Sequence, residues 1–154
     1  MSDLDETLNQ QLANYSATGV VGVGLDYGND KNRAGILLEM GGTNTSQIVI
    51  AESFSNSGAL SDLREDVNDW LAEQNGKITI LGLALKKSNE KWKALILYGS
   101  MEDDAQYQAE SAENTKFSDE QAAVEEDLNS AKDVVAFAFA YGNTNYGSLW
   151  INKT

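Results

Sequence analysis

The chain has 154 residues, with no histidine, cysteine or proline, and its 24 acidic against 11 basic residues give a formal net charge of -13. The missing His and Cys remove the side chain that most often titrates near neutral pH, the usual thiolate nucleophile, and the ligands of zinc, iron–sulfur and haem centres. The acidic balance disfavours direct binding to nucleic acid or to anionic membranes, because both need Lys and Arg at the contact. The length predicts a single acidic domain over residues 1–154. Because the usual metal and haem ligands are missing, we predict no cofactor.

The first half of the chain predicts a helix, three strands and a second helix. Apolar residues recur at helical spacing over 3–16. Three β-rich segments follow at 20–27, 34–40 and 47–54, separated by Gly- and Asn-containing turns. The next amphipathic helix is predicted over 60–74, with Gly76 where a C-terminal glycine is expected.

The second half predicts two hairpins around a third helix. The segment 77–86 is apolar on both faces, which indicates a central strand, and 92–99 is its partner. Residues 101–116 are polar and predict a loop or frayed helix. A helix starts at Ser118, which with Gln121 fits a capping box, and Phe117 with Ala122 would be its hydrophobic staple. A strand over 134–141 and a last strand ending near 151 complete the chain.

Two spacings indicate an internal repeat. Ser-Asp pairs open the three predicted helices at Ser2, Ser61 and Ser118, 59 and 57 residues apart. Tyr-Gly-Asn turns begin at Tyr27 and Tyr141, 114 residues apart. These spacings predict a threefold helix-strand-strand repeat; the alternative is chance, since caps and turns favour the same residues. The predicted fold is α+β, a mainly antiparallel sheet of about seven strands with two or three helices on one face.

The alternation of each strand assigns its apolar face to the core. On the first strand this face is Val21, Val23, Leu25 and Tyr27. The predicted core comprises Leu12, Val23, Leu25, Ile36, Leu38, Val49, Leu63, Val67, Leu71, Ile80, Leu83, Leu95, Leu97, Phe137 and Phe139.

Three local patterns offer weak candidates for chemistry. Gly22-Val23-Gly24 is not followed by the helix that a dinucleotide site requires. Asp26, Asp30 and Asn32 surround one turn but lack the spacing of a calcium loop. The run 102–104 supplies adjacent carboxylates, whereas two-metal sites need carboxylates from separate elements. We therefore predict no catalytic residue and no metal site.

The strongest functional signal is an acidic segment. Between 101 and 133 we count eleven acidic residues against Lys116 and Lys132, so this fifth of the chain holds -9 of the total charge. The segment is either a solvated face or a docking surface for a basic protein. The predicted partner-binding residues are Asp103, Asp104, Glu110, Glu113, Glu125 and Glu126.

The order helix, three strands, helix, two strands, helix over residues 3–130 resembles the class I type III secretion chaperones. That resemblance implies a small, acidic, cytoplasmic homodimer. The N-terminus also lacks a signal peptide, and no apolar run would span a membrane, so we expect a cytoplasmic location. The expected function is non-enzymatic binding to a basic protein, as an inhibitor, immunity or counter-defence protein. The alternatives are a homo-oligomeric chaperone or assembly subunit, and a hydrolase using carboxylates and a divalent metal.

Overall fold

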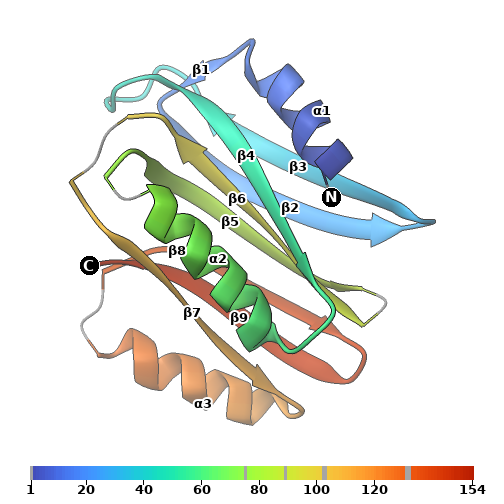
Figure 1. Cartoon of the computed structure of the whole chain (residues 1–154). Helices are drawn as coiled ribbons and strands as arrows, with labels where there is room; N and C mark the ends of the chain where they lie inside the picture. Colours follow the sequence, from blue (N-terminus) through green and yellow to red (C-terminus); the bar gives the residue numbers. More distant parts are fainter. Residues whose placement is uncertain (1, 75, 89, 102–103, 131–132) are drawn as a thin grey trace.

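The computed structural model describes residues 2–74, 76–88, 90–101, 104–130 and 133–154. Within them the chain forms three helices and nine strands (Figure 1). The helices are α1(Ser2–Leu12), α2(Leu60–Gln74) and α3(Phe117–Leu128). The strands are β1(Ser16–Ala17), β2(Gly19–Gly28), β3(Lys31–Glu39), β4(Gln47–Asn56), β5(Thr79–Ser88), β6(Lys91–Gly99), β7(Tyr107–Asn114), β8(Asp133–Gly142) and β9(Asn145–Lys153). Every described ladder is antiparallel, and the α+β class is confirmed.

The strands divide among three sheets with the orders β1-β4-β6-β5, β2-β3 and β7-β9-β8. Two strands come from segments that the sequence did not mark as β. Ser16–Ala17 pairs with the start of β4, and Tyr107–Asn114 pairs along the whole of β9. The prediction of a loop or frayed helix at 101–116 was therefore wrong over 107–114, because polar β7 is an edge strand whose outer side chains do not need to be apolar.

The chain consists of three successive units: unit 1 (residues 2–39), unit 2 (47–99) and unit 3 (107–153). Units 2 and 3 share the order strand, helix, hairpin, with the leading strand beside the second hairpin strand, as in β4-β6-β5 and β7-β9-β8. Unit 1 has the helix and the hairpin β2-β3. The helix–hairpin order that the spacings predicted thus occurs three times in the described structure.

The three hairpins match in detail. Each first strand carries a register shift two residues into the ladder, which leaves Val21, Leu81 and Val135 out of the pairing. These positions are 60 and 54 residues apart, so the hairpins align without a gap from the bulge to the turn. The first and third turns have positive φ at both central residues, Asn29–Asp30 and Asn143–Thr144, as a two-residue type I′ turn requires.

The bulges change which side chains reach the core. Val20 and Val23 pack inward, whereas Val21 is 63% exposed. The prediction that Val21 shares a buried face with Val23 was therefore wrong, because a bulge interrupts the period of two.

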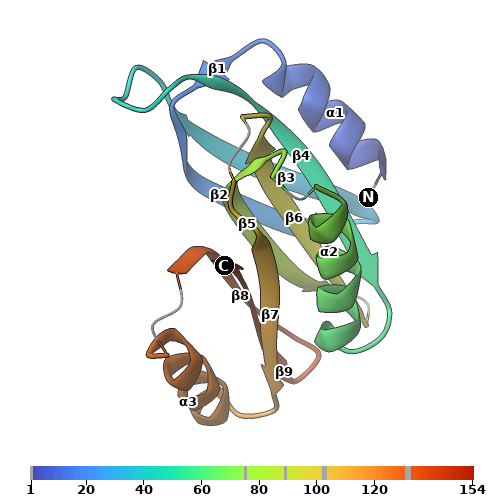
Figure 2. The ribbon, with the colours of Figure 1, turned by 60° about the vertical axis from the view of Figure 1, so that its left-hand side comes forward.

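The units are layered, and the sheet of unit 2 lies in the middle. Figures 1 and 2 show α1, β4, α2, β7 and α3 following one another across the molecule, with α3 at the end farthest from α1. One face of β6 gives Leu95 and Leu97 to a core shared with α1 and the β2-β3 hairpin. The other face gives Trp92 and Ile96 to a core shared with α2 and the unit 3 sheet. Both cores are built where one unit covers the next.

Strand β5 is the outermost strand of its sheet in the order β1-β4-β6-β5. The prediction that it is a central strand was therefore wrong. Leu83 and Leu85 are nevertheless buried. A Cβ added at Gly82 would lie only 3.4 and 3.5 Å from side-chain atoms of Val20 and Val23 of β2. Close packing of whole strands across layers therefore explains why this strand is apolar on both faces.

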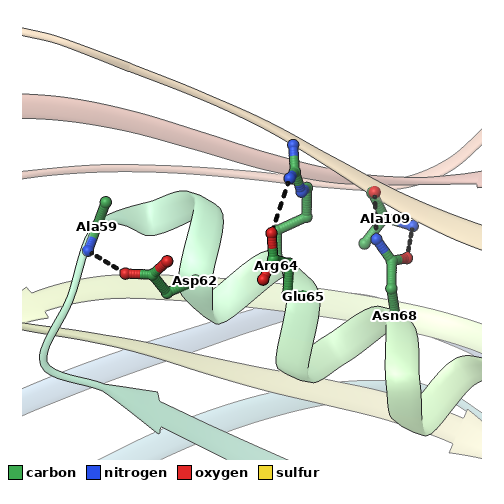
Figure 3. A network of polar contacts seen from close by, with 6 residues as sticks. All are labelled: Ala59, Asp62, Arg64, Glu65, Asn68 and Ala109. Atoms are coloured by element: carbon green, nitrogen blue, oxygen red, sulfur yellow. Dashed lines mark hydrogen bonds and ion pairs between the residues drawn. The ribbon is translucent and has the colours of Figure 1, made fainter.

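Helices α1 and α2 are each joined to the following unit by an asparagine that makes two hydrogen bonds to one backbone residue. The Asn9 amide donates to the Ala51 carbonyl (3.1 Å) and accepts from the Ala51 N–H (2.8 Å). Asn68 makes the same pair of bonds with Ala109, at 3.0 and 2.7 Å (Figure 3). Each asparagine satisfies backbone groups on the open edge of a leading strand. We call this contact the asparagine clamp.

Candidate functional site

The six predicted partner-binding residues do not form one surface. Asp103 lies outside the described residues, and Asp104 is exposed shortly before β7. Glu110 and Glu113 are both on β7, three residues apart, so their side chains point to opposite faces of the sheet. Only Glu125 and Glu126 lie together, on the exposed side of α3.

Glu113 has a structural role. One carboxylate oxygen accepts a hydrogen bond from the backbone N–H of Leu60 (2.8 Å). The other accepts from the Trp92 indole (3.3 Å) and the Asn145 amide (2.8 Å). These bonds join the start of α2 to the sheets of units 2 and 3. The prediction that Glu113 belongs to an exposed docking surface was therefore wrong.

Glu125 occupies the clamp position of α3. It stands seven residues after Ser118, as Asn9 stands seven after Ser2 and Asn68 seven after Ser61. Its carboxylate cannot both donate to a carbonyl and accept from an N–H while ionised. Instead it is exposed and accepts from Gln121 (2.8 Å). Within the described residues, α3 therefore makes no asparagine clamp and leaves carboxylates facing solvent.

The side of α3 that faces its sheet carries acidic residues at both ends. Glu120 is 1% exposed and stands where α1 has Leu4 and α2 has Leu63. One of its oxygens accepts from Asn114 (2.8 Å), and the other has no hydrogen-bond partner. At the far end of the helix, the Trp150 indole donates to Asp127 (2.9 Å). The predicted capping box was also wrong, since Lys116 is the N-cap residue and no side chain caps the helix.

An exposed group of aromatic rings borders α3. We call it the aromatic row; it comprises the exposed Phe117, Phe137, Phe139 and Tyr141 and the half-buried Tyr146. The rings contact one another edge-to-face and stacked, with centroids 4.6 to 6.3 Å apart among Phe117, Phe139, Tyr141 and Tyr146. Phe137 stacks on Trp150 at 6.4 Å.

The aromatic row overturns two core predictions. Phe137 and Phe139 are 44% and 43% exposed, while the intervening alanines of β8 are buried. The large side chains were assigned to the core by size, but the close approach of β5 admits only small residues on the inner face. Phe117 is 54% exposed and packs on Phe139, not on Ala122 as a staple.

Repeat equivalence explains the position of this row. Phe137 and Phe139 align with Leu83 and Leu85 of β5, which are buried where unit 2 covers unit 3. Unit 3 has no following unit in the described chain, so its equivalent residues face outward. Their alignment with the earlier units was the signal that could have identified them from sequence.

The oxygens of the first hairpin turn are engaged by the protein itself. Asp26 forms an ion pair with Lys86 (3.3 Å), and its pKa is lowered by the Tyr27 backbone N–H and by Lys86. Asp30 accepts from the Tyr27 hydroxyl (3.1 Å), and Asn32 accepts from Lys93 (2.9 Å). Among the residues the structure describes, no group of three acidic side chains is arranged to hold a metal ion.

Lys93 is, like Glu120, a buried charged residue that the sequence analysis did not predict. It is 7% exposed, with its ammonium 3.6 Å from the centroid of the Tyr27 ring. Burial lowers the pKa of Lys93, and the contacts with Tyr27 and Asn32 hold it against the neighbouring hairpin. It fastens unit 1 to unit 2.

Two hollows in the described part of the surface offer no free catalytic group. A hollow of about 320 Å³ beside the three bulges is lined entirely by apolar residues of β2, β5 and β8. Another, of about 550 Å³, contains Glu113 and Arg64, but both Glu113 oxygens are already hydrogen-bonded.

No family model, curated protein or solved structure matches this chain. The resemblance to secretion chaperones therefore has no support beyond element order, from which β1 and β7 depart. Among the described residues, no helix is both long and apolar enough to cross a membrane.

Proposed function

We propose that the protein acts by binding a protein partner with a basic surface, and that it does so through the end face of unit 3. The end face consists of the aromatic row and the exposed carboxylates of α3, Asp119, Glu125 and Glu126. The observation that carries the proposal is the exposure of Phe137 and Phe139 at positions that unit 2 buries. Exposed, clustered aromatic rings are typical of residues that dominate binding energy.

Charge supports the choice of a basic partner. The end face carries carboxylates beside the rings, and the whole chain has a net charge of -13. Lys and Arg side chains of a partner would meet both the carboxylates and the ring faces, since cations are attracted to each. Inhibition or immunity by blocking a basic surface needs only such contacts and no catalytic group.

Two variants separate the parts of the end face. Glu125→Lys with Glu126→Lys reverses the charge, and Phe139→Ser with Tyr141→Ser removes two rings. Glu65→Lys with Asp66→Lys is the matched charge control, because these exposed α2 residues lie outside the end face. All three should keep the wild-type circular dichroism spectrum.

The immobilised proteins are used to capture binders from host extract, and a binder identified by mass spectrometry is then purified. Wild type and control should bind it equally. Charge reversal should slow association roughly tenfold at low salt, and loss of the rings should speed dissociation. Equal binding by all variants, or a captured partner without a basic surface, would contradict the proposal.

A further inference from the structure

Within the described residues, unit 1 has no strand equivalent to the leading strands β4 and β7 of the other units. In unit 2, β6 lies between β5 and the leading strand β4; in unit 3, β9 lies between β8 and β7. The equivalent strand β3 forms a ladder with β2 only, in the part of the chain that the structure describes. Its other edge leaves a row of backbone groups without a strand partner, a template for a further strand.

A groove marks the place of the missing strand. It lies between α1 and β3, has a volume of about 170 Å³, and is lined mainly by apolar side chains. Leu8 and Leu12 form the helix wall, and Ala34, Ile36 and Leu38 form the strand wall. In unit 2 the corresponding position beside α2 is filled by β4, with Phe54 packed on Trp70 at 5.7 Å. A strand beside β3 would fill this groove with its own side chains.

The sequence of β3 is suited to pair with itself. In an antiparallel pairing of two β3 strands centred on Gly35, Lys31 of each copy stands opposite Glu39 of the other. Arg33 is then the diagonal neighbour of the same Glu39, within reach of a long side chain. On the groove side, Ala34 stands opposite Ile36, small against large. Any residue i meets residue 70 - i, so all nine residues of β3 are used, one more than the eight pairs of each leading-strand ladder in units 2 and 3.

We propose that the protein forms a symmetric homodimer in which β3 of one copy occupies the leading-strand position of the other. The two hairpins join into one sheet in the order β2-β3-β3-β2. Opposite charges at both ends of the new ladder set its register. The sister units supply the geometry, since their leading strands are also antiparallel to the second hairpin strand. This interface is separate from the end face of unit 3 and leaves that face open in each copy.

A single cysteine tests the register directly. The chain contains no cysteine, and a Cβ at Gly35 would meet open space. Opposed residues of an antiparallel pair lie about 4.5 to 5.5 Å apart at Cα, which suits a disulfide. Gly35→Cys should therefore become a covalent dimer under mild oxidation. Gly24→Cys is the matched control, since Gly24 is opposite Gly35 within the hairpin, is equally open, and stands one strand further from the two-fold axis.

Light scattering after size exclusion tests the pairing without a covalent bond. Wild type should have twice the chain mass. Lys31→Glu or Glu39→Lys alone should raise the dissociation constant roughly tenfold or more, because each places like charges opposite one another twice. The double variant Lys31→Glu, Glu39→Lys should restore the dimer, and Lys91→Glu at the equivalent position of β6 should leave it unchanged. A monomeric wild type, or a dimer insensitive to both single reversals with no Gly35→Cys cross-link, would overturn the proposal.

Discussion

Helices α2 and α3 occupy the same place in successive units, yet the side that faces the sheets differs. Helix α2 presents Leu63, Val67 and Leu71, all buried, and clamps the next leading strand with Asn68. Helix α3 presents Glu120 at the position of Leu63 and Glu125 at the position of Asn68. Helix α2 thus buries the unit that follows it, whereas α3 carries carboxylates at the equivalent positions and displays Glu125 to solvent.

The largest expected effect on the free energy of unfolding comes from shortening an apolar side chain where α2 and α3 face the sheets. Leu63→Ala should lower the free energy of unfolding by about 2 to 5 kcal/mol, because it opens a cavity in the shared core of units 2 and 3. Val124→Ala, on the half-buried side of α3, should cost less than about 1 kcal/mol. Urea denaturation with matching m-values measures both. Equal costs would show that α3 carries as much of the core as α2.

The asparagine clamps should come next in size. Asn68→Ala leaves the N–H and carbonyl of Ala109 without their partner, and Asn9→Ala does the same to Ala51. Each should destabilise the protein by about 1 to 3 kcal/mol. Asn68→Asp keeps the acceptor for the Ala109 N–H but places a carboxylate oxygen against the Ala109 carbonyl, so it should cost at least as much as Asn68→Ala.

Glu125→Ala provides the comparison from unit 3. It should change the free energy of unfolding by less than about 0.5 kcal/mol, since Glu125 is exposed and meets no following strand. If Asn68→Ala is as mild as Glu125→Ala, the clamp does not hold the units together.

The sequence predicted most of the elements but not how they are layered. Helical periodicity located 60–74 correctly, and the core residues Leu63, Val67 and Leu71 are confirmed. Strand β7 was missed because its inner face needs few apolar side chains: Ala109 is buried, while Glu113 is satisfied by hydrogen bonds from distant segments. No local pattern reveals such partners.

The candidate site was harder to predict for the same reason. Counting charge located the acidic segment, but it could not separate Glu113, which joins two sheets, from Glu126, which faces solvent. The exposure of Phe139 depends on which layer follows unit 3. The sequence indicates this exposure only when the three hairpins are aligned with one another. That alignment requires the positions of the bulges, which the structure supplies.

The smallest expected effect is on the pH dependence of the free energy of unfolding, where Glu52 and Asp26 should act in opposite directions. Glu52 on β4 is half-buried, and burial, together with the charge of Asp5, raises its pKa. A carboxyl whose pKa is higher in the folded state stabilises the fold below its unfolded pKa, and this contribution is lost as pH rises through the folded value. Glu52→Gln should therefore raise the free energy of unfolding at pH 7, and the gain should fade toward about pH 4.

Asp26 provides the opposite sign, because its hydrogen bond from Tyr27 and its ion pair with Lys86 lower its pKa. Its contribution is present above the unfolded pKa and is lost as pH falls through the folded value. Asp26→Asn should therefore destabilise the fold at pH 7 and lose this effect in acid. Denaturation of both variants at the two pH values measures the contrast. If the two substitutions shift stability in the same direction at pH 7, burial and the charge of Asp5 do not control the contribution of Glu52.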